Sequence, residues 1–180
     1  MSYYIKLNKS ISVPEFEELE ETMYFGENKE KTVLQYLNVN MPNSENLYKI
    51  IPKEFRKDFR LNSTRINSQL GVHLDTDATC RINFYMVTDN CITRFFLPKV
   101  DYPFRKTING KVVFSRSDLN EIDSFVAQPG EAWLLNVQKL HDVTPPNGIN
   151  FCQRRAITLF TTKFSFIEVS EMLKQTGYID

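Results

Sequence analysis

Histidine is scarce in this chain of 180 residues, which contains only His73 and His141. Cysteine is nearly as rare. Cys80, Cys91 and Cys152 are odd in number and show no C-x-x-C spacing, so neither a disulfide framework nor a structural zinc site is indicated. We therefore expect all three cysteines to be reduced, small, buried hydrophobic residues.

An excess of charge and a long apolar run are also missing. Lys and Arg number 22, and Asp and Glu number 22, so the broad positive field used in nonspecific nucleic-acid binding is absent. No stretch approaches the ~18 successive apolar residues of a membrane span, and residues 1–10 do not have the apolar run of a signal peptide. The sequence predicts a cytoplasmic protein without a nucleic-acid or membrane partner.

The chain has the length of one domain with a sizeable core, and we expect residues 1–180 to form a single domain. Fourteen Phe and eight Tyr favour an aromatic-rich core built from strands, with a lined pocket. The periodicity divides the domain into a helical support region over 1–67, a β core over 68–164 and a C-terminal helix over 165–180.

Helix signals lie at both ends of the chain. Ser12 and Glu15 have the spacing of a capping box, Pro14 suits a first turn, and an apolar face follows as far as Gly26. A second apolar stripe predicts a helix near 51–59. Near the C-terminus, Ser165 and Glu168 form another capping box before a helix that Gly177 can end.

From about Ser68 the apolar period changes to two, which predicts strands. In the best example, Ile82, Phe84 and Met86 share one face, while Arg81, Asn83, Tyr85 and Val87 share the other. Asn109-Gly110 predicts a hairpin turn within 107–114. Further strands are expected over 93–97, 132–137 and 154–160, so the middle of the chain predicts a sandwich or barrel.

Both histidines lie where a non-haem iron site would need them. His73 and Asp75 are two positions apart, and His141 comes from a distant part of the chain. A 2-His-1-carboxylate facial triad has this composition and leaves three coordination positions open. The spacing alone is weak, because a given histidine has an acidic residue two positions later with odds of about one in eight. An ordinary strand histidine and an ordinary loop histidine are the alternative.

Asp75 is preferred to Asp77 as the carboxylate ligand. In an extended chain His73 and Asp75 point to one side, whereas Asp77 would lie about 13–14 Å of extended chain from His73. We expect Asp77 to cap a turn instead.

The arginine pair Arg154-Arg155 opens the last predicted strand. Arg154 shares its strand face with small Ala156 and polar Thr158, as expected for a barrel interior. Arg155 lies on the opposite face with the branched apolar residues Ile157 and Leu159. Arg154 is therefore predicted to point inward, where its planar guanidinium could hold a carboxylate with two hydrogen bonds. A surface salt bridge is the alternative for Arg154 and the preferred interpretation of Arg155.

Taken in order, these segments resemble a known enzyme family. Residues 69–160 resemble the double-stranded β-helix, or jelly-roll, core of Fe(II)/2-oxoglutarate-dependent dioxygenases, which is akin to the cupins. The similar branches are the aspartyl/asparaginyl β-hydroxylase-like and prolyl-hydroxylase-like enzymes, including small bacteriophage-encoded oxygenases. The segments that carry the resemblance are His73-Leu74-Asp75, Arg81-Ile82-Asn83-Phe84-Tyr85, Pro129-Gly130-Glu131-Ala132-Trp133, His141-Asp142-Val143 and Arg154-Arg155-Ala156.

The resemblance implies a role for each candidate residue. His73, Asp75 and His141 would hold Fe(II), and Arg154 would anchor the distal carboxylate of 2-oxoglutarate. It also implies that Asn83 helps to bind this cosubstrate. Tyr85 could line the same pocket or be a core tyrosine, and Trp133 is expected to be core.

The expected function is that of an Fe(II)- and 2-oxoglutarate-dependent oxygenase that uses O₂, most simply a hydroxylase. The resemblance favours an amino-acid side chain as substrate, in a protein or free, and residues 98–128 could form a lid over the site. Two alternatives stay open: a cupin-like metalloenzyme that does not use 2-oxoglutarate, and a non-catalytic jelly-roll binding or structural protein.

Overall fold

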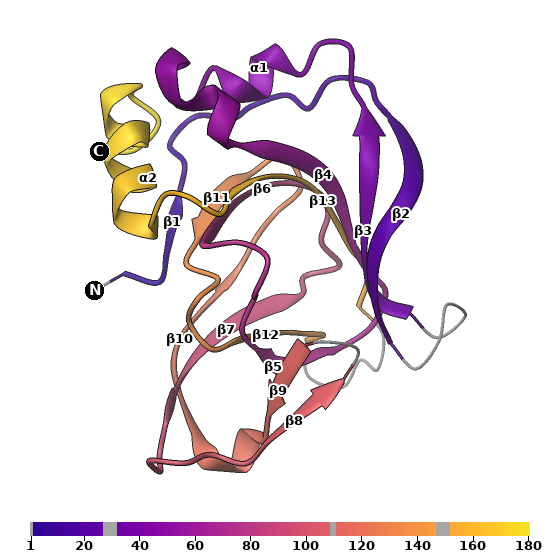
Figure 1. Ribbon diagram of the computed structural model, residues 1–180, viewed down its shortest axis with the longest axis vertical. Coiled ribbons are helices and arrows are strands. Elements are labelled where there is room, and N and C mark those ends of the chain that lie inside the picture. Colours follow the sequence, from indigo (N-terminus) through magenta and orange to yellow (C-terminus); the bar gives the residue numbers. More distant parts are fainter. Residues whose placement is uncertain (1, 27–31, 109–110, 147–151) are drawn as a thin grey trace.

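Two antiparallel sheets pack as a sandwich in the computed structural model, which describes residues 2–26, 32–108, 111–146 and 152–180 (Figure 1). The larger sheet has the strand order β1 (Tyr4–Lys6), β11 (Ala132–Leu135), β6 (Cys80–Val87), β13 (Arg154–Thr161), β4 (Arg60–Ile66), β3 (Thr32–Asn40) and β2 (Glu17–Gly26). The smaller sheet has the order β10 (Leu119–Val126), β7 (Ile92–Pro98), β12 (His141–Thr144), β5 (Leu70–His73), β9 (Lys111–Phe114) and β8 (Arg105–Ile108).

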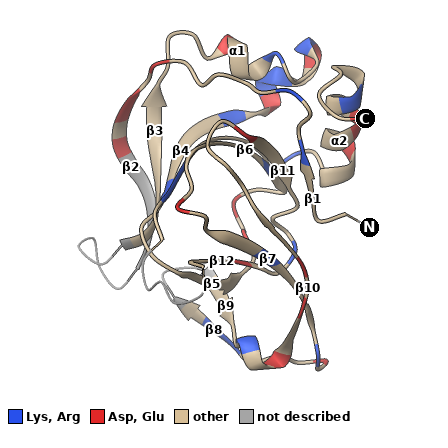
Figure 2. Cartoon of the chain, turned by 180° about the vertical axis from the view of Figure 1, so that it is seen from behind, with Lys and Arg blue, Asp and Glu red and all other residues tan. Residues whose placement is uncertain are grey.

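The described helices are few and short, and most lie over the outer face of the larger sheet (Figure 1, and from behind in Figure 2). They are α1 (Glu45–Tyr48), the 3-10 helices η1 (Lys53–Asp58) and η2 (Arg116–Asp118), and α2 (Phe166–Gln175). No helix in the described ranges is long and apolar enough to cross a membrane.

The C-terminal helix confirms the prediction made from its capping box. Ser165 accepts from the backbone N–H of Glu168, and the Glu168 side chain accepts from the backbone N–H of Ser165. Gly177 follows the helix with a φ of +73°, a conformation that costs glycine little. Val169 and Leu173 are fully buried against the larger sheet, and burial of each such side chain contributes about 1.5–3 kcal/mol.

The predicted alternation on β6 is present. Ile82 and Phe84 belong to the apolar cluster beneath α2, on the outer side of the larger sheet. Arg81, Asn83 and Tyr85 lie on the other side, and all three are buried. The strands predicted over 93–97, 132–137 and 154–160 correspond to β7, β11 and β13.

The predicted N-terminal helix over 12–26 is wrong, because residues 17–26 form β2 and pair with β3. Phe16 packs against the core and Glu18 is largely enclosed, whereas Leu19 is 48% exposed. Burial therefore follows a period of two here, and cross-strand pairing overrides the helical spacing of the apolar residues. Near 51–59 the predicted helix is the shorter 3-10 helix η1.

The cysteine prediction is wrong for two of the three residues. Cys91 and Cys152 form a disulfide across 61 positions, with their Cα atoms 6.0 Å apart, whereas Cys80 is a free, buried thiol as expected. An odd cysteine count without a spacing motif carries no information about a pairing created by the tertiary fold. Burial raises the pKa of the Cys80 thiol to about 12.

The segment 98–128 has regular structure of its own. Strands β8 and β9 pair as the predicted hairpin, with Ile108 opposite Lys111, and η2 and β10 follow. The turn residues Asn109 and Gly110 lie outside the described residues. Whether this segment acts as a lid stays a prediction.

Candidate metal centre

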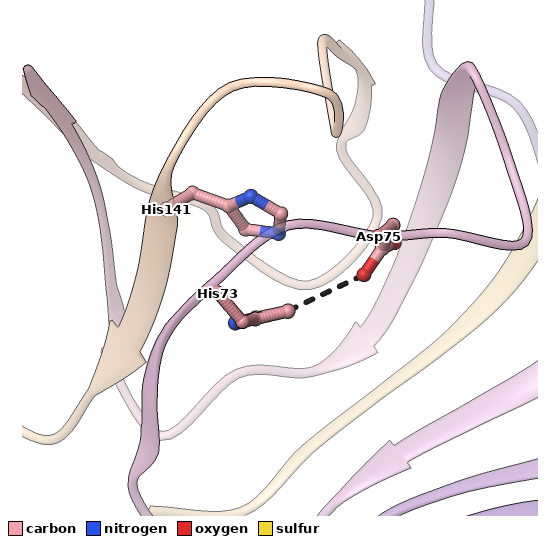
Figure 3. A group of neighbouring side chains, drawn as sticks. All are labelled: His73, Asp75 and His141. Atoms are coloured by element: carbon pink, nitrogen blue, oxygen red, sulfur yellow. Dashed lines mark ion pairs between the residues drawn. The ribbon is translucent and has the colours of Figure 1, made fainter. Parts of the chain in front are cut away.

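Strand pairing brings the two histidines together. His73 is the last residue of β5, His141 is the first residue of β12, and the two residues are directly opposite each other in the antiparallel register. Their ring centroids are 4.3 Å apart. Asp75 follows β5 in an irregular segment, where its backbone N–H donates to the carbonyl of Val137. Figure 3 shows the three side chains converging on one space.

The distances within this cluster suit one small ion. One nitrogen from each histidine and one carboxylate oxygen of Asp75 all lie within 4.8 Å of one another. His73 Nε2 and Asp75 Oδ1 are 3.3 Å apart, the contact marked by the dashed line in Figure 3. All three residues are buried, with 2–7% of each residue exposed. Polar groups buried together in this way need a shared partner or a dense hydrogen-bond network.

Both imidazoles are oriented by hydrogen bonds to the backbone. His73 Nδ1 lies 2.8 Å from the carbonyl oxygen of Gly71, and His141 Nδ1 lies 2.8 Å from that of Lys139. A carbonyl can only accept, so each Nδ1 carries a proton, and in the neutral ring Nε2 is then the atom that can bind a metal ion. Metal-binding histidines are held in this way by a backbone or carboxylate acceptor. The arrangement is the strongest sign that the two rings are prepared as ligands.

The two carboxylate oxygens of Asp75 have different neighbours. Its Oδ2 accepts from Arg81 Nε at 2.7 Å, while Oδ1 faces His73. Asp77 does not join the cluster, because its Oδ2 accepts from Arg81 Nη2 at 2.7 Å and 26% of its side chain is exposed. The structure thus places Asp75, and not Asp77, beside the histidines.

A small cavity of about 40 Å³ opens between the two sheets next to this cluster. Each enclosed water needs roughly 10–15 Å³ of such volume, so the cavity has room for about three. Its walls are formed by Leu34, Tyr36, Thr64, Ile66, Leu70, His73, Asp75, Arg81, Asn83, Leu135, Val137, His141, Val143 and Arg154.

Arg154 points into this cavity, as the strand alternation predicts. It is only 7% exposed, its Nη1 donates to Thr93 Oγ1 at 2.6 Å, and its guanidinium lies over the ring of Tyr85 at 4.9 Å. Arg155 faces the other way and pairs with Glu18 at 3.2 Å. The two neighbouring arginines therefore lie on opposite faces of β13.

Asn83 also lines the cavity, whereas Tyr85 does not. Asn83 Oδ1 accepts from Thr158 Oγ1 at 2.9 Å, and its Nδ2 donates to the Tyr85 hydroxyl at 3.2 Å. Tyr85 is 1% exposed within an apolar cluster that also contains Trp133, so both are core residues. Tyr85 can act on the cavity only through Asn83 and Arg154.

Sequence reasoning missed two charged residues around the triad. Arg81, which the apolar alternation placed on the same strand face as Asn83 and Tyr85 without giving it a role, binds Asp75 directly. Asp142 follows His141 and is contacted by Arg94 at 3.8 Å and by Arg116 of η2 at 3.4 Å. Burial raises the pKa of Asp142 to about 6, although both arginines act to lower it. The signal available in the sequence for Asp142 was an acidic residue directly after the second histidine.

Comparison with known proteins identifies no family. No protein-family model matches the chain, and no curated protein matches it significantly. The fold and the site therefore define the molecule on their own, as a mainly β sandwich with a buried His-Asp-His cluster that could hold a metal ion.

Proposed function

We propose that this protein is an Fe(II)- and 2-oxoglutarate-dependent oxygenase, with His73, Asp75 and His141 as the iron ligands. The observation that carries the proposal is the arrangement of the triad. Two histidine Nε2 atoms and one carboxylate oxygen converge in a buried cavity, and each ligand has its other polar atom occupied. Two imidazoles and one carboxylate are the donor set of non-haem Fe(II) oxygenases.

The strand order supports a jelly-roll interpretation of the sandwich. Eight strands form two four-stranded groups, β4-β13-β6-β11 and β5-β12-β7-β10, in which early and late strands alternate. Two interleaved Greek keys give this kind of order. The additional strands β1, β2, β3, β8 and β9 extend these groups at their edges. We propose that the core is a double-stranded β-helix on these grounds.

The charges around the cavity favour a dianionic cosubstrate. Arg81 and Arg154 offset the carboxylates of Asp75 and Asp77, so a divalent ion would leave an excess of two positive charges. 2-Oxoglutarate carries two negative charges and could place one carboxylate on Arg154 as a charge-assisted pair. Asn83 and Thr158 add polar groups to the same part of the cavity. The cavity must widen to take this molecule, since it holds only about three waters.

The proposed reaction balances with oxygen as the oxidant. 2-Oxoglutarate, O₂ and a substrate C–H group would give succinate, CO₂ and the corresponding alcohol. Bound iron would supply the oxygen-activating chemistry, while the protein binds, orients and shields the reactants. Within the chain, Arg81 fixes Asp75, and the apolar walls formed by Leu135, Val137 and Val143 limit access of water. We propose an amino-acid side chain, free or in a protein, as the substrate.

Succinate formation without an added substrate tests the reaction class. Protein loaded with Fe(II) should release succinate slowly from 2-oxoglutarate in the presence of oxygen, because the cosubstrate can react before a C–H bond is presented. The rate should fall to background in His141→Ala and Arg154→Ala. Arg155→Ala should keep the wild-type rate. Absence of both turnover and cosubstrate binding would contradict the proposal.

A cupin-like metalloenzyme without 2-oxoglutarate is the second candidate, and the small size of the cavity favours it. In that case Arg154 would be an internal structural arginine held by Thr93 and Tyr85. Metal would bind to the triad with the same ligands. Titration of 2-oxoglutarate into the metal-loaded protein separates the two candidates, because only the first predicts saturable binding.

A further inference from the structure

Arg81 is a buried cation beside the triad, with 4% of the residue exposed. Its guanidinium lies between two aromatic rings, 4.7 Å from the centroid of Tyr36 and 5.1 Å from that of Phe160. Its Nε donates to Asp75 and its Nη2 donates to Asp77, both at 2.7 Å. One rigid, planar group therefore binds both carboxylates that lie close enough in sequence to His73 to compete for the same ion.

This arrangement does not maximise stability. Arg81 Nη1 is buried and has no hydrogen-bond partner among the described residues, and the same holds for Asp77 Oδ1. Each such group costs free energy, and buried ion pairs often contribute no more to stability than apolar side chains of similar volume. A role in the chemistry of the site explains why a cation occupies this position.

The hydrogen bond from Arg81 determines how Asp75 can bind a metal. With Oδ2 engaged, only Oδ1 faces His73 Nε2, at 3.3 Å, so Asp75 is set to bind through one oxygen. The second hydrogen bond turns the carboxylate of Asp77 away from the histidines. Single-oxygen binding by the carboxylate is what leaves three positions of a six-coordinate ion open.

We propose that Arg81 is a positioning residue that selects Asp75 over Asp77 as the carboxylate ligand and keeps Asp75 bound through one oxygen. Lysine cannot reproduce this role fully, because an ammonium group lacks the planar fork that serves two carboxylates at fixed angles. The inference rests on the metal site of the proposed function, and it is independent of 2-oxoglutarate and of turnover.

Cobalt(II) binding to the full chain provides the test, because its visible absorption reports the number and type of ligands. We expect Arg81→Met to weaken Co(II) binding by roughly 10–100-fold, as loss of a residue that orients a metal ligand does. Arg81→Lys should give a smaller loss. Asp77→Asn should keep the affinity and the spectrum of the wild type. Arg155→Met is the matched control, because it removes an arginine and its ion pair from the opposite face of the sheet.

A double variant gives a readout that a purely structural role would not change. In Arg81→Met, Asp77 is released and Asp75 can bind through two oxygens, so the Co(II) spectrum should differ from that of the wild type. Adding Asp77→Asn should alter the spectrum in the Arg81→Met background and leave it unchanged in the wild-type background. Circular dichroism verifies that each variant folds. If Arg81→Met does not fold, Arg81→Lys replaces it in the measurements of Co(II) affinity and of the Co(II) spectrum.

The outcomes separate this inference from the metal site itself. Wild-type affinity and an unchanged spectrum in both Arg81 variants would overturn the inference and leave the triad in place. An equal effect of Asp77→Asn in both backgrounds would also overturn it. Failure of the wild-type protein to bind Co(II), in a form whose folding is verified, would overturn the metal site together with the inference.

Discussion

Two buried arginines line the same cavity, and their surroundings differ sharply. Arg81 is 4% exposed and binds two carboxylates, Asp75 and Asp77. Arg154 is 7% exposed, but in the described part of the chain it has no carboxylate within ion-pair distance, and its hydrogen-bond partner is the neutral hydroxyl of Thr93. The charge of Arg81 is therefore neutralised by carboxylates of the protein, whereas that of Arg154 is not neutralised by any described carboxylate.

This difference divides the cavity into two halves. The Arg81 half carries the triad and holds one guanidinium and two carboxylates, so it has one negative charge in excess, as expected for a site that binds a cation. The Arg154 half keeps an unneutralised guanidinium beside the polar side chains of Asn83 and Thr158. Burying an uncompensated charge is costly, so this half is suited to an anion that enters from solution.

Removing a triad ligand should have the largest effect, because it acts on the metal half directly and on 2-oxoglutarate binding through loss of the metal. His73→Ala, Asp75→Ala and His141→Ala are each expected to abolish stoichiometric Fe(II) retention, because the site has only three protein ligands. Metal analysis after anaerobic purification measures this. Asp77→Ala should retain the ion. Loss of metal in Asp77→Ala but not in Asp75→Ala would reverse the assignment of the ligand.

Removing Arg154 should have the next largest effect, and only on the anion half. Arg154→Ala loses a charge-assisted hydrogen-bonded pair of about 1.5–3 kcal/mol, so the affinity for 2-oxoglutarate should fall roughly ten- to a hundredfold. Fe(II) retention should stay at the wild-type level. Calorimetric titration measures the change, and Arg155→Ala is the control. A larger loss in Arg155→Ala would contradict the assignment of faces on β13.

Reduction of the disulfide should affect the anion half more weakly. Cys152 is two residues before Arg154, and Cys91 is two residues before Thr93, so the disulfide joins the two segments that hold this guanidinium. Reduction should lower the free energy of unfolding by about 2–4 kcal/mol. We expect the 2-oxoglutarate affinity to fall by about threefold or less, which is under 1 kcal/mol, with Fe(II) retention unchanged.

Cysteine alkylation provides the control for this experiment. The native, unreduced protein should show no reactive thiol, because burial raises the pKa of Cys80 to about 12 and the other two cysteines are paired. Unfolding without reductant should expose one thiol and unfolding with reductant should expose three. Two or more reactive thiols in the native protein would contradict the pairing.

The sequence predicted the β core and the triad better than it predicted the rest of the molecule. The pairing of His73 with Asp75 and the inward direction of Arg154 follow from local spacing and strand alternation, since a period of two determines which face of a strand a side chain occupies. His141, distant in sequence, was added from the composition of a 2-His-1-carboxylate triad and from the family resemblance. Strand β2 was mistaken for a helix because its register depends on β3, which follows it in the chain. The Cys91–Cys152 pair and the two hydrogen bonds of Arg81 depend on contacts that only the folded chain creates.

Metal-dependent binding of 2-oxoglutarate tests the central claim most directly. Anaerobic calorimetry would compare titrations of 2-oxoglutarate into the metal-free and the Fe(II)-loaded protein. The division of the cavity into a metal half and an anion half predicts saturable binding of one molecule per chain, tight only when Fe(II) is present, because both halves must act on the same ligand. No binding to the Fe(II) form, or equal binding with and without the metal, would contradict it.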